Sequence, residues 1–251
     1  FTRQLARLCE IILPRTEREE SIKPEYLDKS LLKYPEMALS VTKKEVLRMG
    51  DYALEMISDS LAALSTRKSE DLEEIIRKDE NIDILYKEIR PYISNIRQGE
   101  LDPYESYRET EILLVAEELE NFGDVISKSL ISTLNKCVEY NLWFSPEDWE
   151  HIVDFQSRIK KALDDALTAF REDDWELAEE LSTSQEDITI YYRALHISHL
   201  QKHRQGIDQT IEMSSRYLNL IADFRQLYNL CSNIGRAVAD FGRAAGRPRK
   251  K

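Results

Sequence analysis

Two acidic side chains, Glu120 and Asp124, stand on either side of a glycine in the stretch AEELENFGDVI, residues 116–126. Residues four apart on a helix share one face, with Cβ atoms about 5–6 Å apart, so both carboxylates should project together. Like charges at this spacing destabilise a helix, and a bound divalent or ferric cation would compensate. Gly123 costs a helix about 1 kcal/mol relative to alanine. We interpret it as a point where a neighbouring helix or a ligand comes close.

Further acids could complete such a site, because two earlier helical patterns also carry acids four residues apart. The predicted metal ligands are Glu120, Asp124, Asp51, Glu55, Asp79 and Asp83. Hard cations prefer oxygen ligands, and carboxylate-lined helical bundles hold iron or manganese. The alternative is a solvated acidic face, since the chain contains 47 acids and such pairs are common on exposed helices.

Three of the four histidines fall in the stretch HISHLQKH, where His196, His199 and His203 share one helical face. Three imidazoles on one face are able to bind zinc or nickel. Lys202 and Arg204 add positive charge at the same place, and basic residues suit a helix C-terminus. We therefore expect a solvated helix end here.

Composition and motifs exclude several classes of function. The formal net charge of −12 would repel the phosphate backbone, so we expect no nucleic-acid partner. The three cysteines form no CxxC pair, which argues against a disulfide framework or a cysteine-rich zinc site. The sequence lacks nucleophile-elbow, zinc-protease, P-loop and dinucleotide motifs, and also the repeated Glu-x-x-His pair of di-iron enzymes. We expect no catalytic site.

Hydrophobic residues recur every three or four positions along nearly the whole chain, which predicts an all-α protein. Long helices are expected at roughly 41–67, 69–98, 103–140, 146–172, 174–204 and 208–242, with boundaries uncertain by about 2–4 residues. Pro91 should kink or split the second of these. A short helical lead-in and turn-rich segments are expected before residue 41.

The chain also repeats itself. A shift of 106 residues aligns Tyr86 with Tyr192, and a shift of 105 aligns Leu119 with Phe224. The economical architecture is a tandem of two antiparallel three-helix bundles. We predict a lead-in at 1–40, bundles at 41–140 and 146–242, and a basic tail at 243–251. The second half has Arg225 and Asn229 where the first has Glu120 and Asp124, so a metal site is expected in the first half only.

Several segments resemble one family. LENFGD (residues 119–124) resembles the LERIGD signature of PhoU, the phosphate-uptake regulator family, and KDENIDILYKEI (78–89) is similar to its second-helix pattern. Residues 24–56 and 209–234 resemble the PhoU-like tail of bacterial Na/Pi cotransporters. The resemblance implies two three-helix bundles whose acidic motifs bind metal clusters, often of iron or zinc. The absence of the second acidic motif departs from that pattern.

The resemblance implies a regulatory, non-catalytic domain of a sodium-dependent phosphate transporter, on the cytoplasmic side of the inner membrane. Its expected partners are the membrane transporter domain of the same polypeptide and a second copy in a homodimer. Iron, zinc or another divalent metal is the expected cofactor. The alternatives are a helical docking or dimerisation scaffold without metal, and a di-metal carboxylate enzyme.

Overall fold

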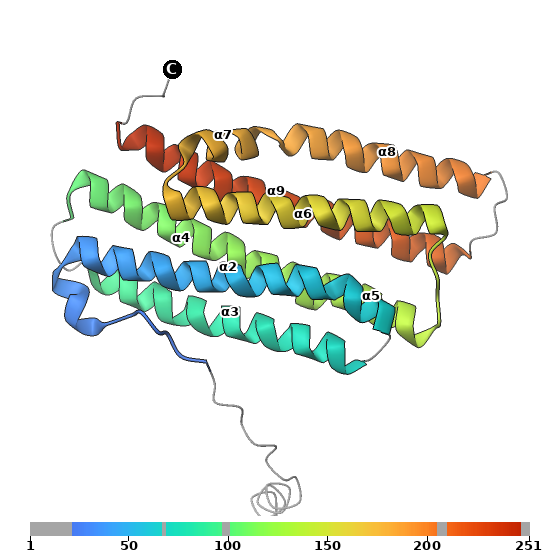
Figure 1. The fold of residues 1–251 in the computed structure, drawn as a ribbon, viewed down its shortest axis with the longest axis horizontal. Coiled ribbons are helices and arrows are strands. Elements are labelled where there is room, and N and C mark those ends of the chain that lie inside the picture. Colours follow the sequence, from blue (N-terminus) through green and yellow to red (C-terminus); the bar gives the residue numbers. More distant parts are fainter. Residues whose placement is uncertain (1–21, 67–68, 97–100, 205–209, 247–251) are drawn as a thin grey trace, which may run out of the picture.

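The computed structural model describes residues 22–66, 69–96, 101–204 and 210–246, and every regular element in these ranges is helical (Figure 1). The elements in chain order are η1 (Lys29–Lys33), α2 (Pro35–Thr66), α3 (Ser69–Ile96), α4 (Pro103–Asp124), η2 (Val125–Leu130), α5 (Ile131–Glu139), α6 (Pro146–Glu172), α7 (Trp175–Thr183), α8 (Gln185–Arg204) and α9 (Ile211–Ala244). The predicted all-α class is confirmed. The expected N-terminal helix and most of the basic tail lie outside the described residues.

Local chemistry sets the helix starts. Asp102 accepts a hydrogen bond from the backbone N–H of Glu105 at 2.8 Å, and the Glu105 side chain accepts one from the backbone N–H of Asp102 at 3.0 Å. This capping box, followed by Pro103, fixes the start of α4 where the sequence placed it. α2 begins at Pro35 instead of near residue 41, because proline suits the first turn of a helix.

The structure excludes one of the two outcomes expected at Pro91 in the second helix, and it differs from the expected fifth helix. α3 continues through Pro91 to Ile96 and is not split there. The expected helix at 174–204 is instead interrupted at Ser184, between α7 and α8. The hydroxyls of Thr183 and Ser184 donate to the carbonyls of Glu180 and Leu181 at 3.0 and 2.7 Å. Such side-chain bonds compete with the helical backbone pattern and favour a break.

The helices pack in two sets that lie side by side, and α7 and α8 together take the place of one long helix in the second set (Figure 1). α2, α3 and α4 contact one another, α9 contacts α6, α7 and α8, and the sets meet where α2 lies on α6 and α4 lies on α9. The buried apolar side chains of both sets form one continuous core, in which Phe155 and Phe224 meet edge to face at 5.6 Å. Burying each such ring contributes about 1.5–3 kcal/mol.

Within the described ranges, no helix is both long and apolar enough to span a membrane.

Candidate metal centre

Three of the predicted acids converge between α3 and α4. Asp83 on α3 and Glu120 and Asp124 on α4 each offer a carboxylate oxygen, and these oxygens lie within 4.8 Å of one another. All three residues are half-buried. In the part of the chain that the structure describes, no other group of three acids, histidines or cysteines meets this condition. We refer to Asp83, Glu120 and Asp124 as the carboxylate group.

Gly123 allows the two helices to approach closely beside this group. A Cβ atom at this position would lie 2.4 Å from Oδ1 of Asp79 and 3.3 Å from Cδ1 of Ile82, both on α3. The first distance is far shorter than any van der Waals contact, so alanine would push the Asp79 carboxylate away. The sequence interpretation of this glycine as a point of close approach is therefore confirmed. It brings a fourth acid to the edge of the carboxylate group.

Burial and like charge make two of these acids, Asp79 and Glu120, harder to ionise. Burial raises the pKa of Asp79, and the charges of Asp124 and Asp83 raise it further, although a hydrogen bond from Ser127 opposes the shift. Burial likewise raises the pKa of Glu120, and Asp124 and Asp83 add to the effect. The folded chain thus holds negative charge here against an electrostatic cost, which a bound cation would relieve.

Two lysines compensate part of this charge. Lys87 lies 2.9 Å from Asp83, and Lys128 forms an ion pair with Asp124. Both lysine side chains are 71% exposed. Exposed pairs of this kind contribute at most about 1 kcal/mol, so a divalent cation is able to displace them.

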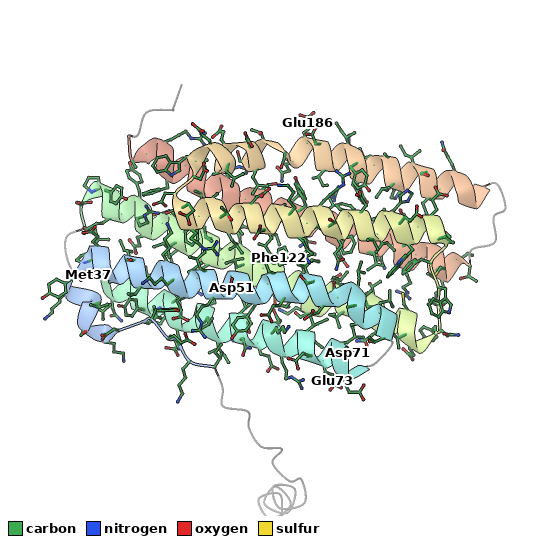
Figure 2. The ribbon with its side chains drawn as sticks, in the orientation of Figure 1. Met37, Asp51, Asp71, Glu73, Phe122 and Glu186 are labelled. Carbon is green, nitrogen blue, oxygen red and sulfur yellow. The ribbon has the colours of Figure 1, made fainter. Side chains whose placement is uncertain are left out.

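Asp51 and Glu55 were also predicted as ligands, but the structure does not bring them to the carboxylate group. Glu55 instead pairs with Lys78 at 2.8 Å, and Asp59 pairs with the same lysine at 2.7 Å. Asp51 is exposed on α2 (Figure 2). Burial raises the pKa of Asp51, and the charge of Arg171 on α6 opposes that shift. Spacing along a helix fixes a shared face but does not say which helix that face meets.

A π-helical turn, η2, follows Asp124 directly, where the sequence predicted an uninterrupted helix. The Ile131 N–H bonds the carbonyl of Ile126, five residues back. π-turns insert one extra residue and often occur at functional sites. Within this turn, Ser129 donates a hydrogen bond to Asp223 of α9 at 2.8 Å. No sequence signal that we considered predicts the turn.

The helical face that carries His196 and His199 is buried at its centre, where a solvated helix end was expected. His199 is only 2% exposed and stacks on Tyr217 with ring centroids 4.4 Å apart. Its Nε2 lies 2.8 Å from Oγ of Ser214, and its Nδ1 lies 3.6 Å from Oδ1 of the buried Asp148. The expectation was wrong for His199, because the same face packs against α6 and α9. The side chain of His203 lies outside the described residues.

A cluster of charges that sequence reasoning missed joins the two sets of helices. Asp173, in the left-handed turn after α6 (φ 54°), accepts from Lys43 at 2.8 Å and from both terminal nitrogens of Arg108 at 2.7 and 3.0 Å. Arg108 also pairs with Glu111 at 2.8 Å and lies over the ring of Phe241. Burial raises the pKa of Glu111 to about 7, despite the opposing charge of Arg108. We call Lys43, Arg108, Glu111 and Asp173 the interface cluster.

The segment that forms the carboxylate group also identifies a domain. Residues 46–129 match the model of the PhoU domain. The match runs from α2 into η2, so it contains Asp79, Asp83, Glu120 and Asp124.

Curated relatives and solved structures extend the likeness to most of the chain. The "putative inorganic phosphate export protein YjbB" of Salmonella typhimurium is 28% identical over 241 residues, which is 96% of this chain and 44% of the relative. The protein of the same description from Escherichia coli K12 is 27% identical over the same span. The chain therefore covers less than half the length of these relatives.

Two crystal structures share the fold. PhoU from Pseudomonas aeruginosa has a TM-score of 0.75 at 17% identity, covering 82% of this chain and 97% of that one. The phosphate transport system regulatory protein PhoU from Streptococcus pneumoniae has a TM-score of 0.72 at 20% identity, covering 82% and 96%. This chain has the PhoU helical-bundle fold.

Proposed function

We propose that the chain is a regulatory, non-catalytic module of phosphate transport that binds a metal cation at the carboxylate group. The observation that carries the proposal is the meeting of Asp83, Glu120 and Asp124 from two helices inside the segment that matches the PhoU domain. The description of the relatives as phosphate export proteins supports the link to phosphate transport.

The donor set favours a hard cation. Asp83, Glu120 and Asp124 would hold the ion through carboxylate oxygens, and Asp79 stands beside them against Gly123. Oxygen-only sites suit manganese, magnesium, calcium or iron better than zinc, which prefers nitrogen and sulfur ligands in structural sites. Of the expected metals, we therefore favour iron over zinc.

Regulation would follow from the position of the ion between two helices. A cation shared by α3 and α4 stabilises the arrangement in which the two helices lie close. It therefore shifts any equilibrium with a more open arrangement toward the close one. We propose that this set of helices docks on a sodium-dependent phosphate transporter domain of the same polypeptide, at the cytoplasmic side of the membrane. Coupling then requires that the docked and free forms bind the cation with different affinity.

A docking scaffold without metal is the second candidate. Lys87 and Lys128 favour it, because their ion pairs with Asp83 and Asp124 already neutralise part of the carboxylate group.

Metal-dependent stability separates these candidates. We expect manganese or ferrous iron to bind the purified chain at about one equivalent, and at 100 times its Kd to add about 2.7 kcal/mol to the free energy of unfolding. The double variant Glu120→Gln/Asp124→Asn should lose both effects. The control variant Glu117→Gln/Glu139→Gln changes net charge equally on exposed residues of α4 and α5 and should retain them. If neither wild type nor control gains stability with any metal, the scaffold is the better description.

A further inference from the structure

The internal repeat assigns a counterpart in the second set of helices to each acid around Gly123. The shift of 106 residues maps α3 onto α7 and α8, and the shift of 105 maps α4 onto α9. The residues matching Asp79, Asp83, Glu120 and Asp124 are, in order, Gln185, Thr189, Arg225 and Asn229. Each carboxylate has become a neutral or cationic side chain that can donate hydrogen bonds. The four residues attract a cation in the first set of helices, whereas their counterparts in the second set attract an anion.

A matched pair of tyrosines, Tyr86 and Tyr192, reports the change of charge between the two sets of helices. On α3, burial raises the pKa of Tyr86, and the neighbouring charges of Glu117 and Glu120 on α4 add to the effect. On α8, the matching Tyr192 has the guanidinium of Arg225 above its ring, 4.5 Å from the centroid. The tyrosine that faces an acid in the first set of helices therefore faces an arginine in the second.

Polar atoms of α9 at this place are shielded from water without being paired. Nε of Arg225 and Oδ1 of Asn229 are buried and have no hydrogen-bond partner among the described residues. A buried donor without a partner is costly, and such groups in folded proteins call for an explanation. An oxygen of a bound anion would accept from Nε. The Asn229 carboxamide offers Nδ2 to the same ligand when it turns by half a rotation.

The polar side chains of the facing helix already have partners. Gln185 and Thr189 lie at the start of α8 and are half-buried, and the Thr189 hydroxyl donates to the backbone carbonyl of Gln185 at 2.9 Å. Oε1 of Gln185 accepts a 3.5 Å hydrogen bond from Arg236, which lies seven residues beyond Asn229 on α9. Glu118 of α4 reaches α9 and accepts from Asn233 at 3.3 and 3.2 Å. Asn233 lies one turn beyond Asn229, on the side away from Arg225.

We propose that Arg225 and Asn229 form a binding site for a tetrahedral oxyanion, namely phosphate or the phosphoryl group of a small phosphate ester. Guanidinium groups bind such anions through two parallel charge-assisted hydrogen bonds. The site stands on its own contacts and does not depend on metal binding at the carboxylate group. The chain would thus pair a cation site in one half with an anion site in the other.

Calorimetric titration of the purified chain with inorganic phosphate, and separately with glycerol 3-phosphate, tests the proposal. We expect one site that takes at least one of the two ligands, and the response to each shows whether free phosphate or an ester is preferred. Arg225→Gln should weaken binding about tenfold or more, since it removes a charge-assisted hydrogen bond. Arg243→Gln makes the same charge change at an exposed position of α9 and should bind as wild type does.

Two further variants keep the test decisive if Arg225→Gln folds poorly. Arg225→Lys retains the charge and should bind more weakly than wild type but measurably. Asn229→Asp restores the acid of the first half and should reduce binding by charge repulsion. The proposal is overturned if wild-type protein binds neither ligand, or if the Arg225 and Asn229 variants bind as tightly as Arg243→Gln does.

Discussion

Replacing Arg108 with methionine is expected to lower the free energy of unfolding by about 3–5 kcal/mol at pH 8, because it leaves a buried carboxylate without its partner. The Arg108 side chain is 11% exposed, and the Glu111 side chain that it pairs with is 1% exposed. The same change removes both hydrogen bonds from Arg108 to Asp173, which join α4 to the turn after α6. Urea unfolding followed by circular dichroism measures the loss.

The exposed pair formed by Arg77 and Glu74 provides the control. Its side chains are 51% and 53% exposed, so Arg77→Met should cost less than about 1 kcal/mol. The loss in Arg108→Met should also shrink at pH 5, where Glu111 takes up a proton and no longer needs a counter-charge. Equal, small losses in the two variants would show that the interface cluster contributes little to stability.

Glu111→Gln is expected to remove a pH dependence from the free energy of unfolding. The pKa of Glu111 is raised from 4.5 to about 7, so between these values the folded chain binds more protons than the unfolded chain does. Stability conferred by the neutral carboxyl is therefore complete below about pH 4.5 and is lost as the pH rises through 7. A shift of this size corresponds to about 3 kcal/mol, at 1.36 kcal/mol for each pKa unit.

Unfolding free energies measured from pH 4 to pH 8.5 test this expectation. Glutamine resembles the neutral carboxyl, so the variant should match wild type near pH 4 and exceed it by up to about 3 kcal/mol at pH 8. Glu74→Gln, an exposed acid, controls for the general effect of removing one charge. Curves for wild type and Glu111→Gln that stay parallel across this range would contradict the assignment.

The sequence predicted the elements that follow from local chemistry. Helices were expected to start at residues 103 and 146, and both do, with a proline in the first turn of each. The close approach at Gly123 was predicted because a glycine inside a helical pattern needs a reason, and the Asp79 carboxylate supplies it. Shared helical faces likewise placed Glu120 beside Asp124.

Features that depend on which helix faces which could not be predicted in this way. Asp51 and Glu55 have the same spacing as Glu120 and Asp124, but Asp51 is exposed and Glu55 pairs with Lys78. The spacing of His199 was compatible with a solvated surface, and only packing against α6 and α9 buries it. The interface cluster joins residues as far apart as Lys43 and Asp173, and no local pattern signals it.

Phosphate flux in membrane vesicles that contain the whole proposed transporter polypeptide tests the central claim most directly. Flux is measured with and without a chelator of divalent cations, for wild type and for Glu120→Gln/Asp124→Asn at equal amounts of protein. If the carboxylate group binds a regulatory cation, the chelator should change the flux of wild type and leave that of the variant unaltered. A chelator response of equal size in both proteins, or in neither, would contradict the proposal.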